Sequence, residues 1–473
     1  MDPIIVWFRQ DLRLADNPAL IHAAQSGQPV VCLYILDDKT PGHWRMGGAS
    51  RWWLHKSLAA LSEALQDKGC KLVLRCGKAA DVLNDVIKET GATSVVWNRC
   101  YEPYAVKRDT AIKKHLSDKD IDVQSFNASL LFEPWEIKTQ GGTPFRVFTP
   151  FWRACLAAPS PAKPQHAPRK IEGYAKRIAS DTLSDWGLLP QKPNWADGFE
   201  DEWTPGEDGA QTRFNAFVKS KADYARGRDA PSDDATSRLS PHLHFGEISP
   251  RQIWHGIHSG ASHKADKFLS EIGWREFSHH LLFHNPSMPD EPLDERFTQF
   301  PWRDASADFR AWAKGQTGIP IVDAGMRQLW QTGYMHNRVR MIAASFLIKH
   351  LRIDWRRGED WFWNTLVDAD LASNAQNWQW VAGCGADAAP FFRIFNPVLQ
   401  GVKFDTDGEY VRRFVPELGK LDAKFIHKPW EADAATLKSA GIELGRNYPR
   451  PLVDLKKGRD AALAAFRELS GSA

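Results

Sequence analysis

The sequence predicts an N-terminal α/β domain with a doubly wound, Rossmann-like parallel sheet, a long linker and a C-terminal all-helical domain. Three observations predict this order. Short β-branched runs alternate with helical patterns over the first 130 residues, Pro, Gly and charged residues dominate from about residue 155 to 210, and helical periodicity prevails from there on. A chain of 473 residues is also too long for one ordinary core. We place the domains at residues 1–130 and 211–473, with the linker at 131–210.

Four apolar runs in the first domain predict buried parallel strands: Ile4–Phe8, Val30–Leu36, Leu72–Leu74 and Ser94–Trp97. Between the second and third runs, an amphipathic helix is marked by Leu54, Leu58, Leu61 and Leu65 and ends near Gly69. The alternation predicts right-handed crossovers. The first strand is followed by RQDLRL, not by GxGxxG or a P-loop, so we expect no standard dinucleotide site in this domain.

The second domain contains clear helical periods, such as Ile321–Trp330, stopped by Gly333, and Val339–Leu351. Its most informative segment is Asp368–Val381, DADLASNAQNWQWV. Helical spacing there would place short polar groups beside large aromatic ones on a shared face: Asp368, Asp370, Asn374, Trp378 and Trp380. A buried helix with a few capped polar groups is the alternative for this segment.

Composition excludes several classes of protein. Hydrophobic residues make up 43% of the chain, enough for globular folding, and a net charge of +3 says little about partners. The six cysteines form no CxxC pair and have no nearby His at metal spacing, so we expect neither a disulfide framework nor a metal site, as in a reducing cytoplasm. We find no signal peptide and no apolar run of membrane-spanning length. The 21 Trp against 8 Tyr suit core packing, or electron transfer where oxidisable rings follow one another.

Three further motifs accompany DADLASNAQNWQWV: TSRLSP (Thr236–Pro241), EIGWREF (Glu271–Phe277) and YMHNRVRM (Tyr334–Met341). Together they resemble the flavin and lesion pockets of the photolyase/cryptochrome family, and the resemblance runs from Ile4 to Arg450. It implies a deoxyribodipyrimidine photolyase, in which light-driven electron transfer from reduced FAD splits cyclobutane pyrimidine dimers in UV-damaged DNA. Trp52-Trp53 with LHKSLAAL, and HNRVRMIAASFLIKHL, resemble the bacterial (class III) group close to plant cryptochromes.

The hydroxyls and free N–H groups of TSRLSP, before a predicted helix start, suit a phosphate, whereas a helix cap would need only one of them. The resemblance implies the following FAD-binding residues: Tyr224, Thr236, Ser237, Arg238, Leu239, Ser240, Phe268, Glu271, Arg275, Arg340, Asp368, Asp370 and Asn374. We expect Arg340 to pair with Asp368, although such a pair is often only structural. Asn374 is expected near flavin N5, where plant cryptochromes carry Asp. Because an amide adds no charge beside a reduced flavin, it favours a repair enzyme.

For the extruded dimer, the resemblance implies these catalytic residues: Glu271, Trp274, Asn337, Met341 and Asn374. The implied DNA-binding residues are Arg228, Glu271, Trp274, Asn337, Arg338, Trp380 and Gln400. The run KHLRIDWRRG is expected to add basic charge nearby, although most charged runs are only solvated faces. A buried Glu271 needs a partner or a shifted pKa. A (6–4) photolyase would carry a pair of histidines where this chain has His336-Asn337.

The resemblance further implies an electron-transfer triad of Trp302, Trp355 and Trp378, with core packing as the alternative. An antenna chromophore is expected beside Arg51 and Glu102, with 5,10-methenyltetrahydrofolate favoured over deazaflavin. Gly273 departs from the branched apolar residue common in the family, which puts the rigidity of the pocket in doubt. The rival function is a cryptochrome-type blue-light photoreceptor. No long tail follows Arg450, which favours the lyase, and we expect a monomer whose partner is damaged DNA.

Overall fold

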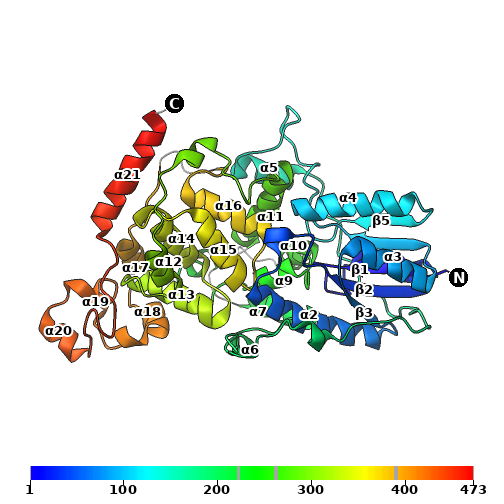
Figure 1. Ribbon diagram of the computed structural model, residues 1–473, viewed down its shortest axis with the longest axis horizontal. Coiled ribbons are helices and arrows are strands. Elements are labelled where there is room, and N and C mark those ends of the chain that lie inside the picture. Colours follow the sequence, from blue (N-terminus) through cyan, green and yellow to red (C-terminus); the bar gives the residue numbers. More distant parts are fainter. Residues whose placement is uncertain (1, 221–223, 260–264, 388–391, 472–473) are drawn as a thin grey trace.

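The computed structural model describes residues 2–220, 224–259, 265–387 and 392–471. An α/β domain carries the N-terminus and a larger helical domain carries the C-terminus, at opposite ends of the molecule (Figure 1). This arrangement confirms the predicted fold class.

A five-stranded parallel sheet with strand order β3-β2-β1-β4-β5 forms the centre of the first domain. The strands are β1 (Ile4–Phe8), β2 (Val30–Leu36), β3 (Leu72–Cys76), β4 (Ser94–Asn98) and β5 (Asp122–Phe126). The first two match the predicted bounds, and β3 and β4 run slightly further than predicted. The prediction missed β5, because this edge strand buries only Val123 and so lacks a continuous apolar run.

Two helical layers cover the sheet. These layers contain α1 (Pro18–Gln25), α2 (Gly48–Asp67), α3 (Ala79–Thr90) and α4 (Pro103–Ser117). Ile4 and Val6 pack with leucines of α1 and α2 on one face, whereas Ile5 and Trp7 pack with apolar residues of α3 and α4 on the other. The predicted leucine-marked helix is α2, and Gly69 follows its end with a positive φ of 91°. Alternate strand residues therefore enter different cores, as a doubly wound sheet requires.

The segment between the domains packs first against the helical domain, through α5, and then runs beside the sheet. Gly173 forms a parallel bridge with Val30. Two helices lie within residues 131–210: α5 (Phe148–Ala157) and α6 (Phe199–Glu202). Phe151 and Trp152 of α5 belong to the core of the helical domain.

The helical domain is a bundle around one large apolar core. Its helices are α7 (Glu207–Lys219), α8 (Tyr224–Gly227), α9 (Ser240–His244), α10 (Pro250–Ser259), α11 (Ala265–His284), α12 (Ser306–Ala313), α13 (Pro320–Thr332), α14 (Asn337–Ser345), α15 (Trp355–Thr365), α16 (Leu371–Ala382), α17 (Pro397–Phe404), α18 (Glu409–Phe414), α19 (Ala423–Ile426), α20 (Ala434–Ser439) and α21 (Leu455–Gly471). Gly333 ends α13 in the left-handed conformation, as predicted.

Two predicted helical segments are corrected. The segment Val339–Leu351 is not one uniform helix, because α14 passes into a π-helical turn at Phe346–His350. The helix expected over Asp368–Val381 begins only at Leu371, because the Asp370 carboxylate caps it by accepting the N–H of Ser373. Asp368 and Asp370 therefore lie on the entering chain, where their carboxylates are free to turn toward other helices.

Within the described residues, no helix is long and apolar enough to cross a bilayer. All six cysteines are free thiols. The same part of the chain contains no group of three or more His, Cys, Asp or Glu side chains placed to hold a metal ion.

Candidate active site

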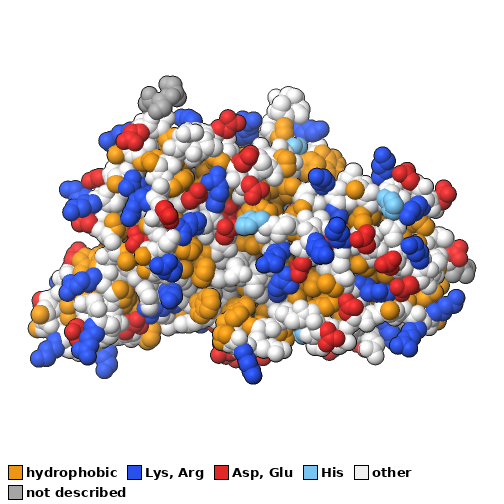
Figure 2. Space-filling view, in the orientation of Figure 1, with side chains coloured by type: hydrophobic (Ala, Val, Ile, Leu, Met, Phe, Trp, Pro, Cys, Tyr) orange, Lys and Arg blue, Asp and Glu red, His pale blue; other side chains and the backbone are white. Residues whose placement is uncertain are grey.

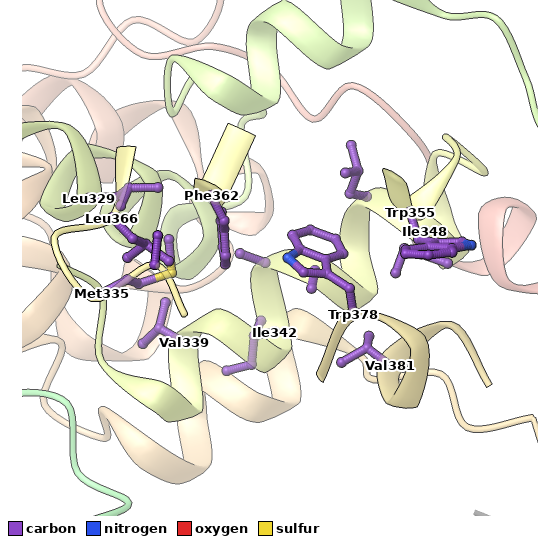
Figure 3. Packing of buried hydrophobic residues seen from close by; sticks show 14 of the residues in the cluster. Leu329, Met335, Val339, Ile342, Ile348, Trp355, Phe362, Leu366, Trp378 and Val381 are labelled. Atoms are coloured by element: carbon purple, nitrogen blue, oxygen red, sulfur yellow. The ribbon is translucent and has the colours of Figure 1, made fainter. Parts of the chain in front are cut away.

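A cavity opens between α14, α15 and α16 in the helical domain. Seven residues singled out in the sequence line it: Asn337, Arg340, Met341, Asp368, Asp370, Asn374 and Trp378. Apolar side chains complete the wall, among them Phe362, Leu366 and Val381; Phe362 and Val381 lie beside Trp378 in Figure 3. A few converging polar groups on an apolar wall are typical of a site for a small molecule.

Arg340 and Asp368 form the predicted pair at the edge of this cavity. Arg340 Nη2 lies 2.9 and 3.1 Å from the two carboxylate oxygens, and Arg340 Nε donates to the Met335 carbonyl at 2.7 Å. Ser240 Oγ donates to the same carboxylate at 2.6 Å. Burial lowers the pKa of Arg340, but Asp368 outweighs it, so this pKa is raised. The pair joins α9, α14 and the chain entering α16.

Asp370 faces two histidines that the sequence reasoning missed. Its carboxylate lies 3.5 Å from His279 Nε2 and 3.7 Å from His244 Nδ1. Burial opposes ionisation of Asp370, but His279, His244 and Arg275 outweigh burial and hold its pKa well below the usual range. A fixed negative charge therefore lines the cavity. The doublet His279-His280 after WREF was the only hint in the sequence.

Asn374 is buried in α16, one turn after the capping Asp370. Its amide Nδ2 donates to the backbone carbonyl of Glu359 in α15 at 3.1 Å. This bond uses one of the two amide N–H groups, so the amide oxygen and the second N–H of this cavity-lining side chain remain for a bound molecule. An uncharged acceptor at this position suits an N–H group of a bound ring.

The TSRLSP segment leads into the short helix α9, with Pro241 in its first turn, as predicted. Arg238 adopts a positive φ of 51°, and its guanidinium pairs with Glu202 at 2.7 Å and lies over the rings of Trp203 and Tyr334. The other predicted residues here are placed as follows: Thr236 hydrogen-bonds Tyr334, Ser237 Oγ accepts the N–H of Leu239, and Leu239 is buried.

Three more predicted cofactor residues, Tyr224, Phe268 and Arg275, are not among the residues that line this cavity. The rings of Tyr224 and Phe268 make an edge contact with centroids 5.4 Å apart, and Phe217 packs against both. Arg275 Nη1 donates to the Ser129 carbonyl at 2.7 Å, and the same guanidinium lies 3.6 Å from Glu276.

The predicted tryptophan triad begins at the cavity wall. Trp378 lines the cavity and contacts Phe362 with ring centroids 5.0 Å apart, and Trp355 is also buried. Figure 3 shows Trp378 between Phe362 and Trp355. Trp302 is half-buried and packs on Phe300 at 4.3 Å, so it has access to solvent.

The two tryptophans predicted to pack around the flipped dimer lie on α11 and α16. Trp274 stacks on Phe148 of α5, with centroids 3.8 Å apart and planes 10° apart, and the Trp380 Nε1–H donates to the Asp387 carbonyl. Glu271, one turn before Trp274, forms an ion pair with Arg228 and lies 3.3 Å from Lys267 Nζ. Glu271 is 26% exposed, not buried, and these two cations compensate its charge.

Gly273 has a packing reason in this chain. A Cβ atom on Gly273 would lie 2.6 Å from the ring of Trp152, which packs from α5 against α11. That ring belongs to the same core as Phe148 and lies nearly parallel to it. Trp152 therefore fills the space of a branched side chain at residue 273, and the helix continues through the glycine without a break.

A second, separate cleft lies between the two domains. Residues from both line it, including Glu102, Tyr34 and Trp44 with Trp363 and His244. Glu102 therefore lies where the antenna prediction places it, with Gln10 donating to its carboxylate at 2.8 Å. Arg51 does not line this cleft itself, but its guanidinium pairs at 2.6 Å with Asp38, which does. Ala369 lines both this cleft and the first cavity.

Comparisons with known proteins match both parts of the chain. Residues 4–169 match the family model "DNA photolyase", and residues 268–468 match "FAD binding domain of DNA photolyase". This chain belongs to the DNA photolyase family. It is 55% identical to the deoxyribodipyrimidine photo-lyase of Agrobacterium fabrum, over 98% of this chain and 97% of that one. It is 40% identical to cryptochrome-1 of Arabidopsis thaliana, over 96% of this chain and 69% of that one.

Solved structures give the same result for this photolyase. A bacterial class III photolyase from Agrobacterium tumefaciens superposes with a TM-score of 0.96 at 54% identity, over 100% of this chain and 98% of that one. A Synechocystis cryptochrome superposes at 0.89 with 28% identity, over 98% and 99%. The predicted class III group, related to plant cryptochromes, and the predicted photo-lyase activity are confirmed.

The cavity of this photolyase fits a flavin by the chemistry of its donor set. The ionised Asp370 and the amide oxygen of Asn374 can accept N–H groups, while Phe362, Trp378 and Val381 offer apolar surface to a flat ring. All five residues lie in the matched FAD-binding segment.

One expectation about this photolyase is wrong. The run KHLRIDWRRG does not supply its full basic charge to the surface, because Lys349 and His350 are buried. Lys349 Nζ donates to the Ala382 carbonyl at 2.5 Å and lies over the Phe392 ring, and burial lowers its pKa far below the usual range. The apolar run before it, MIAASFLI, already indicated a helix facing the core.

Proposed function

We propose that this photolyase splits cyclobutane pyrimidine dimers in UV-damaged DNA, and that the cavity between α14, α15 and α16 is the place of the reaction. One observation carries the proposal: the residues expected to hold FAD and those expected to hold the dimer line the same cavity. Arg340, Asp368 and Asp370 share it with Asn337 and Met341.

FAD, when bound and reduced, supplies a light-driven electron to the dimer. The residues of the chain bind and orient the flavin and the dimer in the cavity. Asp370 holds a fixed negative charge toward ring N–H groups, Asn374 offers a neutral acceptor, and Arg340 with Asp368 shapes the wall. Glu271, whose Oε1 is turned toward Arg228, keeps its second oxygen to accept an N–H group of a pyrimidine base.

Two rival functions are less well supported. A (6–4) photolyase would need a second histidine where this chain has Asn337, and burial with nearby arginines lowers the pKa of His336 to about 4. His336 is therefore uncharged near neutral pH and cannot serve as a cationic acid. A photoreceptor of the plant cryptochrome type would carry a carboxyl group in place of the Asn374 amide, as the family resemblance implies.

The interdomain cleft is the proposed antenna site. Its wall joins aromatic rings, Tyr34, Trp44 and Trp363, to the polar Glu102 and Gln10, which suits a planar heterocycle with N–H groups. We keep 5,10-methenyltetrahydrofolate as the ligand in preference to deazaflavin. The proposal also includes a monomer acting in the cytoplasm, where the six free thiols would stay reduced.

The test is repair of an oligonucleotide that carries one cyclobutane dimer, incubated with chemically reduced protein in light and in darkness. Loss of the dimer only in light is expected. Trp274→Ala should remove a stacking face, so the preference for dimer DNA over undamaged DNA should fall by roughly 5- to 150-fold. Trp135→Ala is the matched control: Trp135 is an exposed ring that packs on Phe283, and its loss should leave that preference unchanged. Equal loss of both affinities in Trp274→Ala would show that the ring is structural.

A further inference from the structure

Each of the two arginines expected to contact DNA phosphates, Arg228 and Arg338, is paired with a carboxylate. Arg228 pairs with Glu271 of α11, and Asp229 pairs with Arg338 of α14, with 2.7 Å between Asp229 Oδ1 and Arg338 Nη2. The chain at residues 228–229 thus spans the two helices that carry Trp274 and Asn337.

Arg338 has few other contacts. Its guanidinium lies over the Phe404 ring at 4.4 Å, and its buried Nε has no hydrogen-bond partner among the described residues. The neighbouring His336 is uncharged near neutral pH and offers Arg338 only an acceptor for its backbone N–H. Asp229 is therefore the group that compensates the Arg338 charge, and its side chain is 37% exposed.

We propose that Asp229 occupies the phosphate position of Arg338 in the free protein, so that a DNA phosphate must displace this carboxylate before Arg338 can bind it. The inference rests on the proposed contact between Arg338 and DNA. Carboxylate and phosphate oxygens are interchangeable partners for a guanidinium, and a half-exposed pair is weak enough to exchange.

This exchange favours damaged DNA. An intact duplex offers its phosphates one at a time, and each must compete with a carboxylate attached to the protein. A dimer inserted in the cavity holds its flanking phosphate beside Arg338, which raises the effective concentration of that phosphate. Asp229 therefore suppresses binding to undamaged DNA more than binding to the lesion. On the face of the molecule that Figure 2 shows, positive and negative side chains are interspersed.

The experiment measures affinity for matched duplexes with and without one dimer, in darkness, over a range of salt. Asp229→Asn keeps the side-chain shape and removes the charge. The affinity of this variant for undamaged duplex should rise roughly two- to fivefold. The plot of log binding constant against log salt concentration should become steeper by about 0.9, because one further phosphate is neutralised. Affinity for dimer DNA should rise less, so the preference shrinks. Glu89→Gln, which breaks the pair with Arg75 on the α/β domain, is the control and should change neither affinity.

Arg338→Ala and the double variant Arg338→Ala/Asp229→Asn complete a cycle. Without Arg338, removing the Asp229 charge should have no effect. If Asp229→Asn strengthens binding equally in both backgrounds, the effect is general electrostatics and the inference is wrong. If Arg338→Ala weakens dimer binding but Asp229→Asn leaves both affinities unchanged, only the inference fails. If Arg338→Ala itself changes nothing, the proposed phosphate contact fails and the inference with it. Unchanged thermal unfolding of the variants would exclude a folding defect.

Discussion

Replacing Asp368 with Asn should remove the ion pair with Arg340 in the wall of the flavin cavity and destabilise the folded protein. The Asp368 side chain is 3% exposed and accepts hydrogen bonds from Arg340 and Ser240. The amide keeps the size of the carboxylate but leaves the Arg340 guanidinium, whose side chain is 22% exposed, without a counter-charge. Breaking one partner of a fully buried pair costs about 3–5 kcal/mol. Because solvent reaches part of Arg340, we expect the free energy of unfolding to fall by about 3 kcal/mol, the lower end of that range.

Urea unfolding followed by tryptophan fluorescence measures this change, because the midpoint falls while the slope stays constant. Asp354→Asn is the matched control. Asp354 pairs with Arg356 on the surface and caps α15, and Asn is an equally good cap, so about 1 kcal/mol or less should be lost. Equal losses in the two variants would refute the view that burial makes the Asp368 pair different.

A double variant separates folding from cofactor binding. Arg340→Met with Asp368→Leu removes both charges, and apolar replacement of a buried pair is often neutral or stabilising. We expect the double variant to unfold at a higher urea concentration than Asp368→Asn. It should still retain less flavin after purification, because the polar wall of the cavity is gone. Full flavin retention would show that the pair serves folding alone.

Three further changes test the site. Glu271→Ala should lower the repair yield at normal flavin content, because the carboxylate beside Arg228 is proposed to contact the dimer, and an unchanged quantum yield would contradict this role. Trp378→Phe should stop light-driven reduction of oxidised flavin, yet protein reduced chemically beforehand should still repair. Reduction at the parental rate would refute the triad. His336→Asn should flatten the pH dependence of unfolding. The pKa of His336 is about 4 in the folded protein and 6.5 in an unfolded chain, so the unfolded chain binds a proton first as the pH falls. The free energy of unfolding is therefore highest above pH 6.5 and falls by on the order of 3 kcal/mol as the pH is lowered toward 4. A parental slope in this variant would rule out His336 as its source.

The sequence predicts those parts of the fold in which local pattern and burial agree. The β1 and β2 runs are apolar at every residue and have the predicted bounds, whereas β5 has a single buried residue and no such pattern. Gly333 ends its helix as predicted because the left-handed conformation there is a local property. The start of α16 was misplaced because Asp370 fits both a helical period and a helix cap.

Within the site, motif residues were predictable and their distant partners were not. Arg340 and Asp368 meet as expected. His244 and His279 approach Asp370 from α9 and α11, and their spacing in the sequence carries no signal of that convergence. Lys349 was expected on the surface because of its charge. Its position in the π-helical turn directs it inward instead, toward the Ala382 carbonyl.

The contact between Gly273 and Trp152 also constrains how this chain can change over generations. The missing Cβ on α11 and the large ring on α5 occupy one shared space, so neither residue can be exchanged freely while the other stays. A branched residue at 273 becomes acceptable only in a descendant that has already acquired a smaller residue at 152. In the reverse order, the new Cβ at residue 273 would lie 2.6 Å from the Trp152 ring, beside the stacked rings of Phe148 and Trp274. Relatives with a branched residue before WREF should therefore carry a smaller side chain at the position that Trp152 holds here.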